Sequence, residues 1–211
     1  MSRTIAIDGP AAAGKGTIAR ALADHFGLLH LDTGLLYRAV GKKYIETGAT
    51  LSDPEIAEIA VALTEDDIVE AELRTTQIAQ VASVVAAIPF VRTALVEKQR
   101  NIAARDGGAI LDGRDIGTVV LPDADVKLFV TASEDVRAER RYQELQARGE
   151  DISFDDVLDA VRRRDKKDSE RDASPMRQAE DAHLIDTSAL SIEDAVQLAI
   201  EIAETGFARG A

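Results

Sequence analysis

The sequence predicts an α/β protein built on a parallel sheet, and three observations support this. Short apolar runs alternate with longer segments of helical periodicity, which is typical of stacked βα units. A glycine-rich loop directly follows the first apolar run, where a strand would pass into a helix. The 211 residues are 45% apolar and 30% charged, a composition that suits a single globular domain with a buried core.

Five apolar runs are the candidate strands of this sheet. Each run is short and ends at a polar or glycine-containing turn, as expected for strands of a parallel sheet. The five runs are Thr4–Ile7, Leu28–Leu31, Ala109–Leu111, Val126–Val130 and His183–Ile185.

Helix signals fill the intervals between these runs. An amphipathic pattern predicts the first helix from Lys15 to about Phe26. Ser52 is followed three residues later by Glu55, with a proline between them, which is the pattern of a capping box. The other expected boundaries are N-caps at Ser133 and Ser153 and a last helix that opens at Ser191 and is closed by Gly206.

Composition excludes several classes of function. The chain has 38 acidic and 25 basic residues and a net charge of −13, so binding to a polyanion is unfavourable and we expect neither nucleic acid nor a membrane as a partner. Cysteine is absent, which excludes disulfides, thiolate zinc sites and cysteine nucleophiles. We find no leader segment or spanning helix and expect a cytoplasmic protein.

Two further residue patterns are expected to be structural. The segment from Glu46 to Glu72 holds nine acidic residues and no Lys or Arg, which we interpret as a solvated face. The histidines, His25, His30 and His183, are scattered along the chain. Such isolated histidines are more often structural than catalytic.

The glycine-rich loop predicts a phosphate site. It reads Gly9-Pro10-Ala11-Ala12-Ala13-Gly14-Lys15-Gly16-Thr17 and fits GxxxxGK with the hydroxyl displaced by one position. Small residues let the backbone fold around an anion, while the loop N–H groups and the start of the next helix point at phosphate oxygens. Lys15 would supply charge for the β and γ phosphates while burying little surface, and Thr17 would offer its hydroxyl to Mg²⁺.

The remaining polar residues favour a kinase over a GTPase switch. Guanine recognition in GTPases uses an Asn-Lys-x-Asp element, and the single asparagine, Asn101, is followed by Ile102. Arginines instead recur along the chain, and their guanidinium groups suit two phosphorylated substrates held face to face. They include Arg38, Arg92, Arg114, Arg137, Arg140, Arg141, Arg164 and Arg171.

Several segments in order make the chain resemble the bacterial cytidylate kinases, essentially from end to end. Besides the loop they are Leu31–Arg38 (LDTGLLYR), Asp112–Val120 (DGRDIGTVV), Arg164–Arg171 (RDKKDSER) and Asp186–Glu193. The resemblance implies a P-loop kinase of the nucleoside monophosphate kinase fold, in which helices flank a five-stranded parallel sheet. It implies one domain over residues 1–211, with a mobile lid at about 137–171 and a short monophosphate-binding insert at about 47–85.

The resemblance also implies a reaction, the transfer of the γ-phosphoryl group of MgATP to CMP or dCMP. We expect the protein to be a monomer. The implied catalytic residues are Lys15, Arg114, Arg164 and Arg171, and Arg140 would join the loop in binding ATP. For CMP, the base would contact Ser83, Arg92 and Asp115, the phosphate Arg38, Arg114 and Arg171, and the ribose Arg164 and Asp168. Thr33 and Tyr37 would line the acceptor pocket, and Thr17 and Asp112 would serve Mg²⁺.

Two alternatives stay open at this point. The chain could be a P-loop kinase for another small molecule, or a regulatory domain that binds ATP without turning it over. ATP consumption that depends on an added acceptor separates these alternatives.

Overall fold

The computed structural model describes residues 3–209, which form two compact units. The sheet unit contains the chain up to Leu31 and again from Arg105 onward, whereas the helical unit is Asp32–Ala104. We describe each unit by itself.

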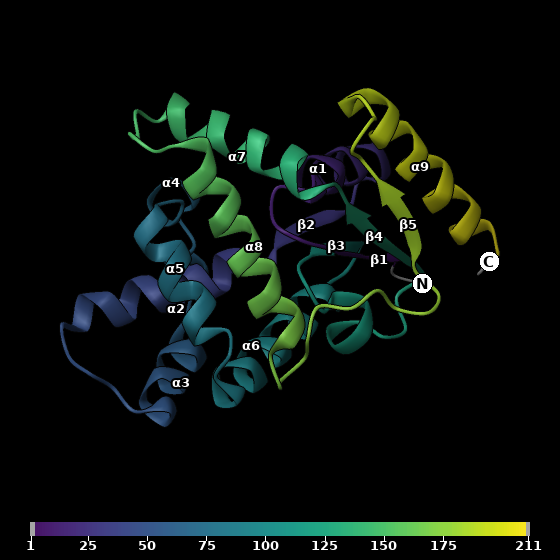
Figure 1. Ribbon diagram of the computed structural model, residues 1–211. Coiled ribbons are helices and arrows are strands. Elements are labelled where there is room, and N and C mark those ends of the chain that lie inside the picture. Colours follow the sequence, from purple (N-terminus) through teal and green to yellow (C-terminus); the bar gives the residue numbers. More distant parts are fainter. Residues whose placement is uncertain (1–2, 210–211) are drawn as a thin grey trace. The chain divides into compact units, whose positions relative to one another are not determined.

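The sheet confirms the predicted fold class. Its strands follow the order β2-β3-β1-β4-β5, and β1 pairs in parallel with both β3 and β4, as does β4 with β5 (Figure 1). Each observed strand lies within one residue of a predicted run. The bounds are β1 (Arg3–Asp8), β2 (Leu29–Asp32), β3 (Gly108–Asp112), β4 (Val126–Thr131) and β5 (His183–Asp186).

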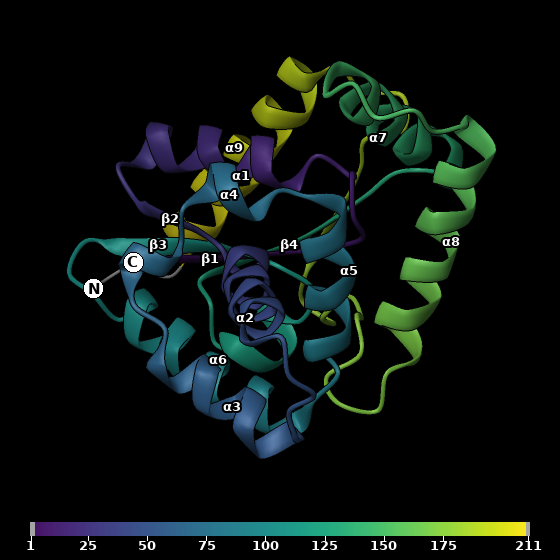
Figure 2. The same cartoon turned by 90° about the vertical axis from the view of Figure 1, so that its left-hand side faces the viewer.

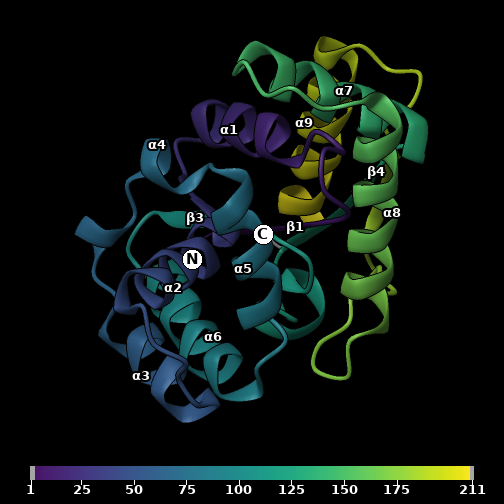
Figure 3. The ribbon, with the colours of Figure 1, turned by 60° about the vertical axis from the view of Figure 1, so that its left-hand side comes forward.

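The core of the sheet unit explains why these runs are strands. Ile5, Ala6 and Ile7 are consecutive and all buried, as expected for a central parallel strand with covered faces. Helices α1 (Lys15–Phe26) and α9 (Ile192–Arg209) lie side by side over this core (Figure 3). The predicted bounds of α1 are confirmed.

The predicted end of the last helix is wrong. Helix α9 continues through Gly206 to Arg209. A β-carbon at Gly206 would lie 2.5 Å from Val126 Cγ2, so the glycine allows the helix to approach β4 closely. The residue serves packing in the middle of a helix, where its sequence signal resembles that of a helix stop.

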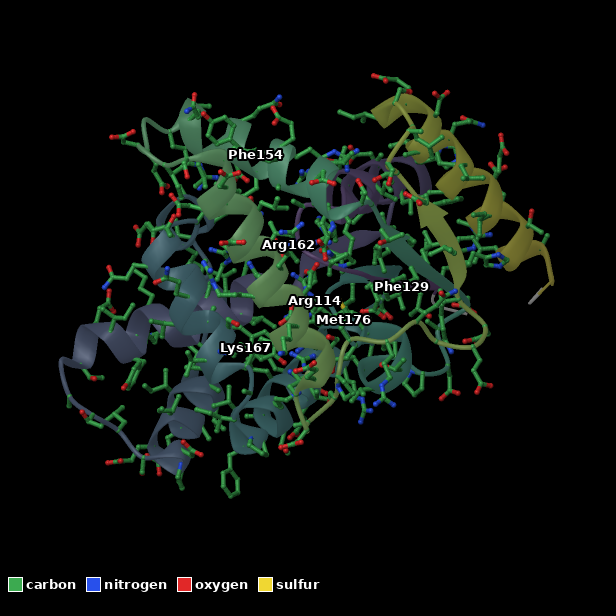
Figure 4. All side chains as sticks on the ribbon, in the orientation of Figure 1. Arg114, Phe129, Phe154, Arg162, Lys167 and Met176 are labelled. Carbon is green, nitrogen blue, oxygen red and sulfur yellow. The ribbon has the colours of Figure 1, made fainter. Side chains whose placement is uncertain are left out.

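Helices α7 (Glu134–Ala147) and α8 (Phe154–Glu170) have a small core of their own. Both begin as predicted, because Ser133 Oγ accepts from the N–H of Val136 and Ser153 Oγ accepts from the N–H of Asp156. Their apolar contacts come from Ala138, Leu145, Val157 and Val161, with Tyr142 and Phe154 packed against them (Figure 4).

The helical unit consists of short helices whose starts are capped. Asp32 caps α2 through the N–H of Gly34, and the capping box of Ser52 and Glu55 opens α3 as predicted. Helices α2 and α5 pack together (Figure 2). The bounds are α2 (Thr33–Thr47), α3 (Asp53–Ala62), the 3₁₀ turn η1 (Glu65–Asp67), α4 (Glu70–Leu73), α5 (Thr76–Val85) and α6 (Pro89–Ala103).

The acidic segment of this unit is largely solvated, as expected. Of its nine acidic residues only Asp67 is half-buried. The ammonium group of Lys43, 2.8 Å away, and the N–H of Thr64 lower the pKa of Asp67 to about 2.

Within residues 3–209, no single helix has both the length and the apolar character needed to cross a bilayer. Only the pair α5 and α6, bent by 101°, meets those two criteria jointly.

Candidate active site

The phosphate loop connects the end of β1 to the start of α1, in the strand–loop–helix context that its motif requires. Gly9 has a φ of +139°, and a β-carbon there would lie 1.9 Å from the carbonyl oxygen of Val130. Gly14, the N-cap of α1, has a φ of +95°. Both conformations favour glycine, so the backbone geometry explains the glycine spacing of the motif.

Lys15 is the first residue of α1 and lies inside the loop. Its Nζ donates a 2.6 Å hydrogen bond to the carbonyl oxygen of Pro10, and the residue is only 6% exposed. The expectation that Lys15 buries little surface is therefore wrong, because the side chain folds back over its own loop. Thr17, in the first turn of α1, is exposed.

Asp8 was missed by the sequence analysis. It ends β1 immediately before the loop, and its carboxylate accepts 2.7 Å hydrogen bonds from the N–H groups of Ile116 and Gly117. Burial raises the pKa of Asp8 to about 6, although these two N–H groups oppose the shift. The signal available in the sequence was an aspartate at the end of an apolar strand. A carboxylate buried there needs hydrogen-bond donors such as these N–H groups.

Asp112 ends β3, the strand next to β1 in the sheet. Its Oδ1 lies 3.0 Å from Nε2 of His30 on β2, and both side chains are largely buried. Its Oδ2 lies 4.0 Å from the position that a β-carbon at Gly16 would take. The carboxylate therefore has one oxygen at the imidazole and the other near the start of α1.

Asp168 and Asp115 hold Arg114, Arg164 and Arg171, three of the expected site arginines. Asp168 Oδ2 lies 2.8 Å from Nε of Arg114 and 3.9 Å from Nε of Arg164, and Figure 4 shows Arg114 beside α8. Asp115 Oδ1 lies 3.4 Å from Nη2 of Arg171. Burial would raise the pKa of Asp168, but the charges of Arg114, Arg164 and Arg171 lower it below its usual value.

The arginines of α7 have three different environments. Arg137 is buried and forms a two-point ion pair with Asp165, at 3.1 and 2.6 Å, while its Nε donates to the carbonyl of Ala132. Arg140 donates to both oxygens of Thr187, at 3.0 and 2.9 Å. Arg141 pairs with Glu144 near the surface.

Five of the expected CMP-binding residues belong to the helical unit. The guanidinium carbon of Arg92 lies 5.6 Å from the centre of the Tyr37 ring, which is within cation–π range. Arg92 also donates to the carbonyl of Ala86, and Arg38 donates to that of Leu73. Thr33 is buried at the start of α2 and Ser83 is half-buried on α5.

The side chains present fit Mg²⁺ carried in by a nucleotide. Among residues 3–209 no group of three or more His, Cys, Asp or Glu side chains is arranged to hold a metal ion. Mg²⁺ is typically bound through one or two protein oxygens together with substrate phosphates and water. Asp112, at the end of β3 beside β1, and Thr17, in the first turn of α1, suit that role.

Comparison with known proteins identifies close relatives. The family model described as "Cytidylate kinase" matches residues 5–205. A cytidylate kinase of Methylocella silvestris is 56% identical over 204 residues, covering 95% of this chain and 94% of that protein. One from Cereibacter sphaeroides is 53% identical over 210 residues, covering 100% and 99%.

Solved structures agree with the fold. A gluconokinase from Sinorhizobium meliloti aligns with a TM-score of 0.51 and 16% identity, covering 99% of this chain and 93% of that one. An uncharacterized protein from Eubacterium ventriosum aligns with a TM-score of 0.59 and 14% identity, covering 97% and 99%. At these identities the likeness concerns the fold alone.

Proposed function

The chain belongs to the cytidylate kinase family, and from this membership we propose that it transfers the γ-phosphoryl group of ATP to CMP or dCMP. The products are ADP and CDP or dCDP. The observation that carries the proposal is the match of the family model over residues 5–205. Phosphoryl transfer depends on positioning and charge neutralisation, without a protein nucleophile.

On the donor side, the loop Gly9–Thr17 would hold the ATP phosphates through its N–H groups and the start of α1. Lys15 Nζ donates to the carbonyl of Pro10, and a phosphate oxygen would replace that acceptor when ATP binds. Thr17 and Asp112 would hold Mg²⁺, which neutralises charge on the β and γ phosphates when it is bound. Arg140 would add a contact to ATP.

On the acceptor side, arginines would bind the phosphate of CMP. Arg38, Arg114 and Arg171 already bind carbonyl or carboxylate oxygens, and phosphate oxygens suit the same guanidinium geometry. Arg164 and Asp168 would hold the ribose. Arg114, Arg164 and Arg171 would also neutralise charge that develops during transfer.

The cytosine base would be read by Ser83, Arg92 and Asp115. Thr33 and Tyr37 would line the acceptor pocket. Asp115 as a carboxylate can only accept a hydrogen bond, which favours the amino group of cytosine over the carbonyl of uracil. The pairing of Arg92 with Tyr37 supports a fixed position for that arginine.

We further propose that residues of about 137–171 form a lid and those of about 47–85 a monophosphate-binding insert. The separate apolar cluster between α7 and α8 supports a lid that moves as one piece. We also propose that the protein acts as a monomer in the cytoplasm, with no nucleic-acid or membrane partner, as its net charge of −13 favours.

An acceptor panel tests the proposed reaction. Formation of ADP is measured with CMP, dCMP, UMP, AMP and gluconate in turn, and without an acceptor. We expect CMP and dCMP to give the highest rates. A rate independent of the acceptor, or a preference for gluconate, would contradict the proposal.

A further inference from the structure

His30 has a position that the proposed reaction does not yet explain. It lies on β2, and its Nε2 is 3.0 Å from Asp112 Oδ1 at the end of the neighbouring β3. The two side chains are 16% and 8% exposed, respectively. Because a carboxylate accepts and does not donate, Nε2 carries the proton of this hydrogen bond.

The hydrogen bond leaves a defined orientation for Asp112. With Oδ1 directed at His30, Oδ2 faces the start of α1, 4.0 Å from the β-carbon position at Gly16. Gly16 is followed by Thr17, the other residue proposed to serve Mg²⁺. The imidazole thus sets which carboxylate oxygen is presented to the loop.

We infer that His30 is a positioning residue for the metal-nucleotide site, holding Asp112 so that Oδ2 faces the divalent cation carried by the donor nucleotide. This inference rests on the proposed function, because it assumes that Asp112 serves the metal. Hydrogen-bond partners of metal-binding side chains typically contribute ten- to a hundredfold to metal affinity or activity. His30 acts through Asp112 and touches no substrate.

The test measures the affinity of the full-length protein for ADP by titration calorimetry, once with saturating Mn²⁺ and once with EDTA. The ratio of the two affinities reports how strongly the metal strengthens nucleotide binding. For His30→Leu we expect this ratio to fall by about tenfold, while the affinity in EDTA stays unchanged. For His30→Gln we expect most of the ratio to be retained, because the glutamine amide can donate from a similar place.

Two further variants make the result specific. His25→Leu is the matched control, since His25 is an exposed histidine beside Glu204, and it should leave the ratio unchanged. Asp112→Asn should itself lower the ratio, and adding His30→Leu to it should cause no further loss.

Three outcomes would overturn the inference. One is an unchanged ratio in His30→Leu, and another is an equal loss in His30→Leu and His30→Gln, which would indicate a packing role. The third is an unchanged ratio in Asp112→Asn, which would also remove Asp112 from the metal site. The proposed reaction is tested by a separate measurement, the turnover of CMP by the wild-type protein. A failure of the inference about His30 can therefore be distinguished from a failure of the proposed reaction.

Discussion

The phosphate loop and the arginines Arg114 and Arg171 of the sheet unit are both proposed to bind phosphate groups, and the structure holds them in place in different ways. The loop relies on backbone shape, which Gly9 and Gly14 fix through positive φ angles, and on the charge of Lys15. The two arginines are positioned by side chains instead: Arg114 by the carboxylate of Asp168, and Arg171 by that of Asp115. The shape of the loop is fixed by its backbone, whereas Arg114 and Arg171 would have to exchange carboxylate partners for phosphate oxygens.

This difference indicates where each site is vulnerable. A backbone cradle depends on a few residues whose replacement removes binding outright. Arg114 and Arg171 already pair with carboxylates, so each would contribute only the difference in free energy between its contact with a phosphate and its contact with that carboxylate. We therefore expect larger losses from the loop than from any single arginine.

The largest effect is expected from Lys15→Met, which keeps the buried aliphatic stem and removes the charge. The rate of CMP phosphorylation should fall by roughly a thousandfold, as for loss of a preorganised donor to developing charge. Circular dichroism should show an unchanged fold. A turnover close to that of the wild type would show that the loop does not bind the donor phosphates, which would contradict the comparison made above.

The second effect concerns Asp8, whose carboxylate ties the end of β1 to the backbone of residues 116 and 117. Its pKa in the folded protein is about 6, above the ordinary 3.8, so its contribution to stability is full below pH 4 and is lost as the pH rises towards 6. Between pH 4 and pH 7, the unfolding free energy of the wild type should fall by roughly 2.5 kcal/mol relative to that of Asp8→Asn.

Urea denaturation of both proteins across this pH range measures the difference directly, because other titrating groups cancel between them. A difference that does not vary with pH would mean that the Asp8 carboxyl is not perturbed by burial.

The third prediction tests whether Arg114 binds the acceptor nucleotide. Arg114→Met should raise KM for CMP by roughly ten- to a hundredfold, the range for a hydrogen bond to a charged group, and leave KM for ATP nearly unchanged. Arg162→Met is the matched control, because Arg162 is an exposed arginine of α8 that pairs with Glu134 (Figure 4). Equal changes in both KM values would place Arg114 on the other nucleotide.

The smallest effect is a change of specificity. In Asp115→Asn the amide can turn its donor towards the uracil carbonyl, so the ratio of kcat/KM for CMP over UMP should fall by at least roughly tenfold. Parallel rate measurements with the two acceptors give this ratio. If Asp115 only orients Arg171, which lies 3.4 Å away, both rates should drop by one factor and the ratio should stay constant.

The sequence predicted the strands and the helix starts well, because these depend on residues that are close together in the chain. The five strands are short apolar runs, and Ser52, Ser133 and Ser153 cap helices through hydrogen bonds to residues three positions further along the chain. Gly206 was misinterpreted because its role depends on Val126, 80 positions away in the chain. A helix stop and a close helix–strand contact use the same residue type.

The sequence singled out the candidate site residues, but it did not predict the contacts between them. The motifs singled out these residues, but the pairing of Arg114 with Asp168 and of Arg171 with Asp115 depends on tertiary structure. The link from Arg137 to Asp165 and that from His30 to Asp112 likewise join residues from different elements. Asp8 stands one position outside the loop motif, so the motif alone did not identify it.

The contact of Gly9 with β4 limits how the gene for this protein can change. A substitution at codon 9 that replaces glycine with another residue adds a β-carbon 1.9 Å from the carbonyl oxygen of Val130, a distance that no heavy-atom pair tolerates without a shift of the strand. At Gly14 a β-carbon would meet nothing within 4 Å, and asparagine tolerates a positive φ. Folding alone therefore requires glycine at position 9, independently of any selection for nucleotide binding.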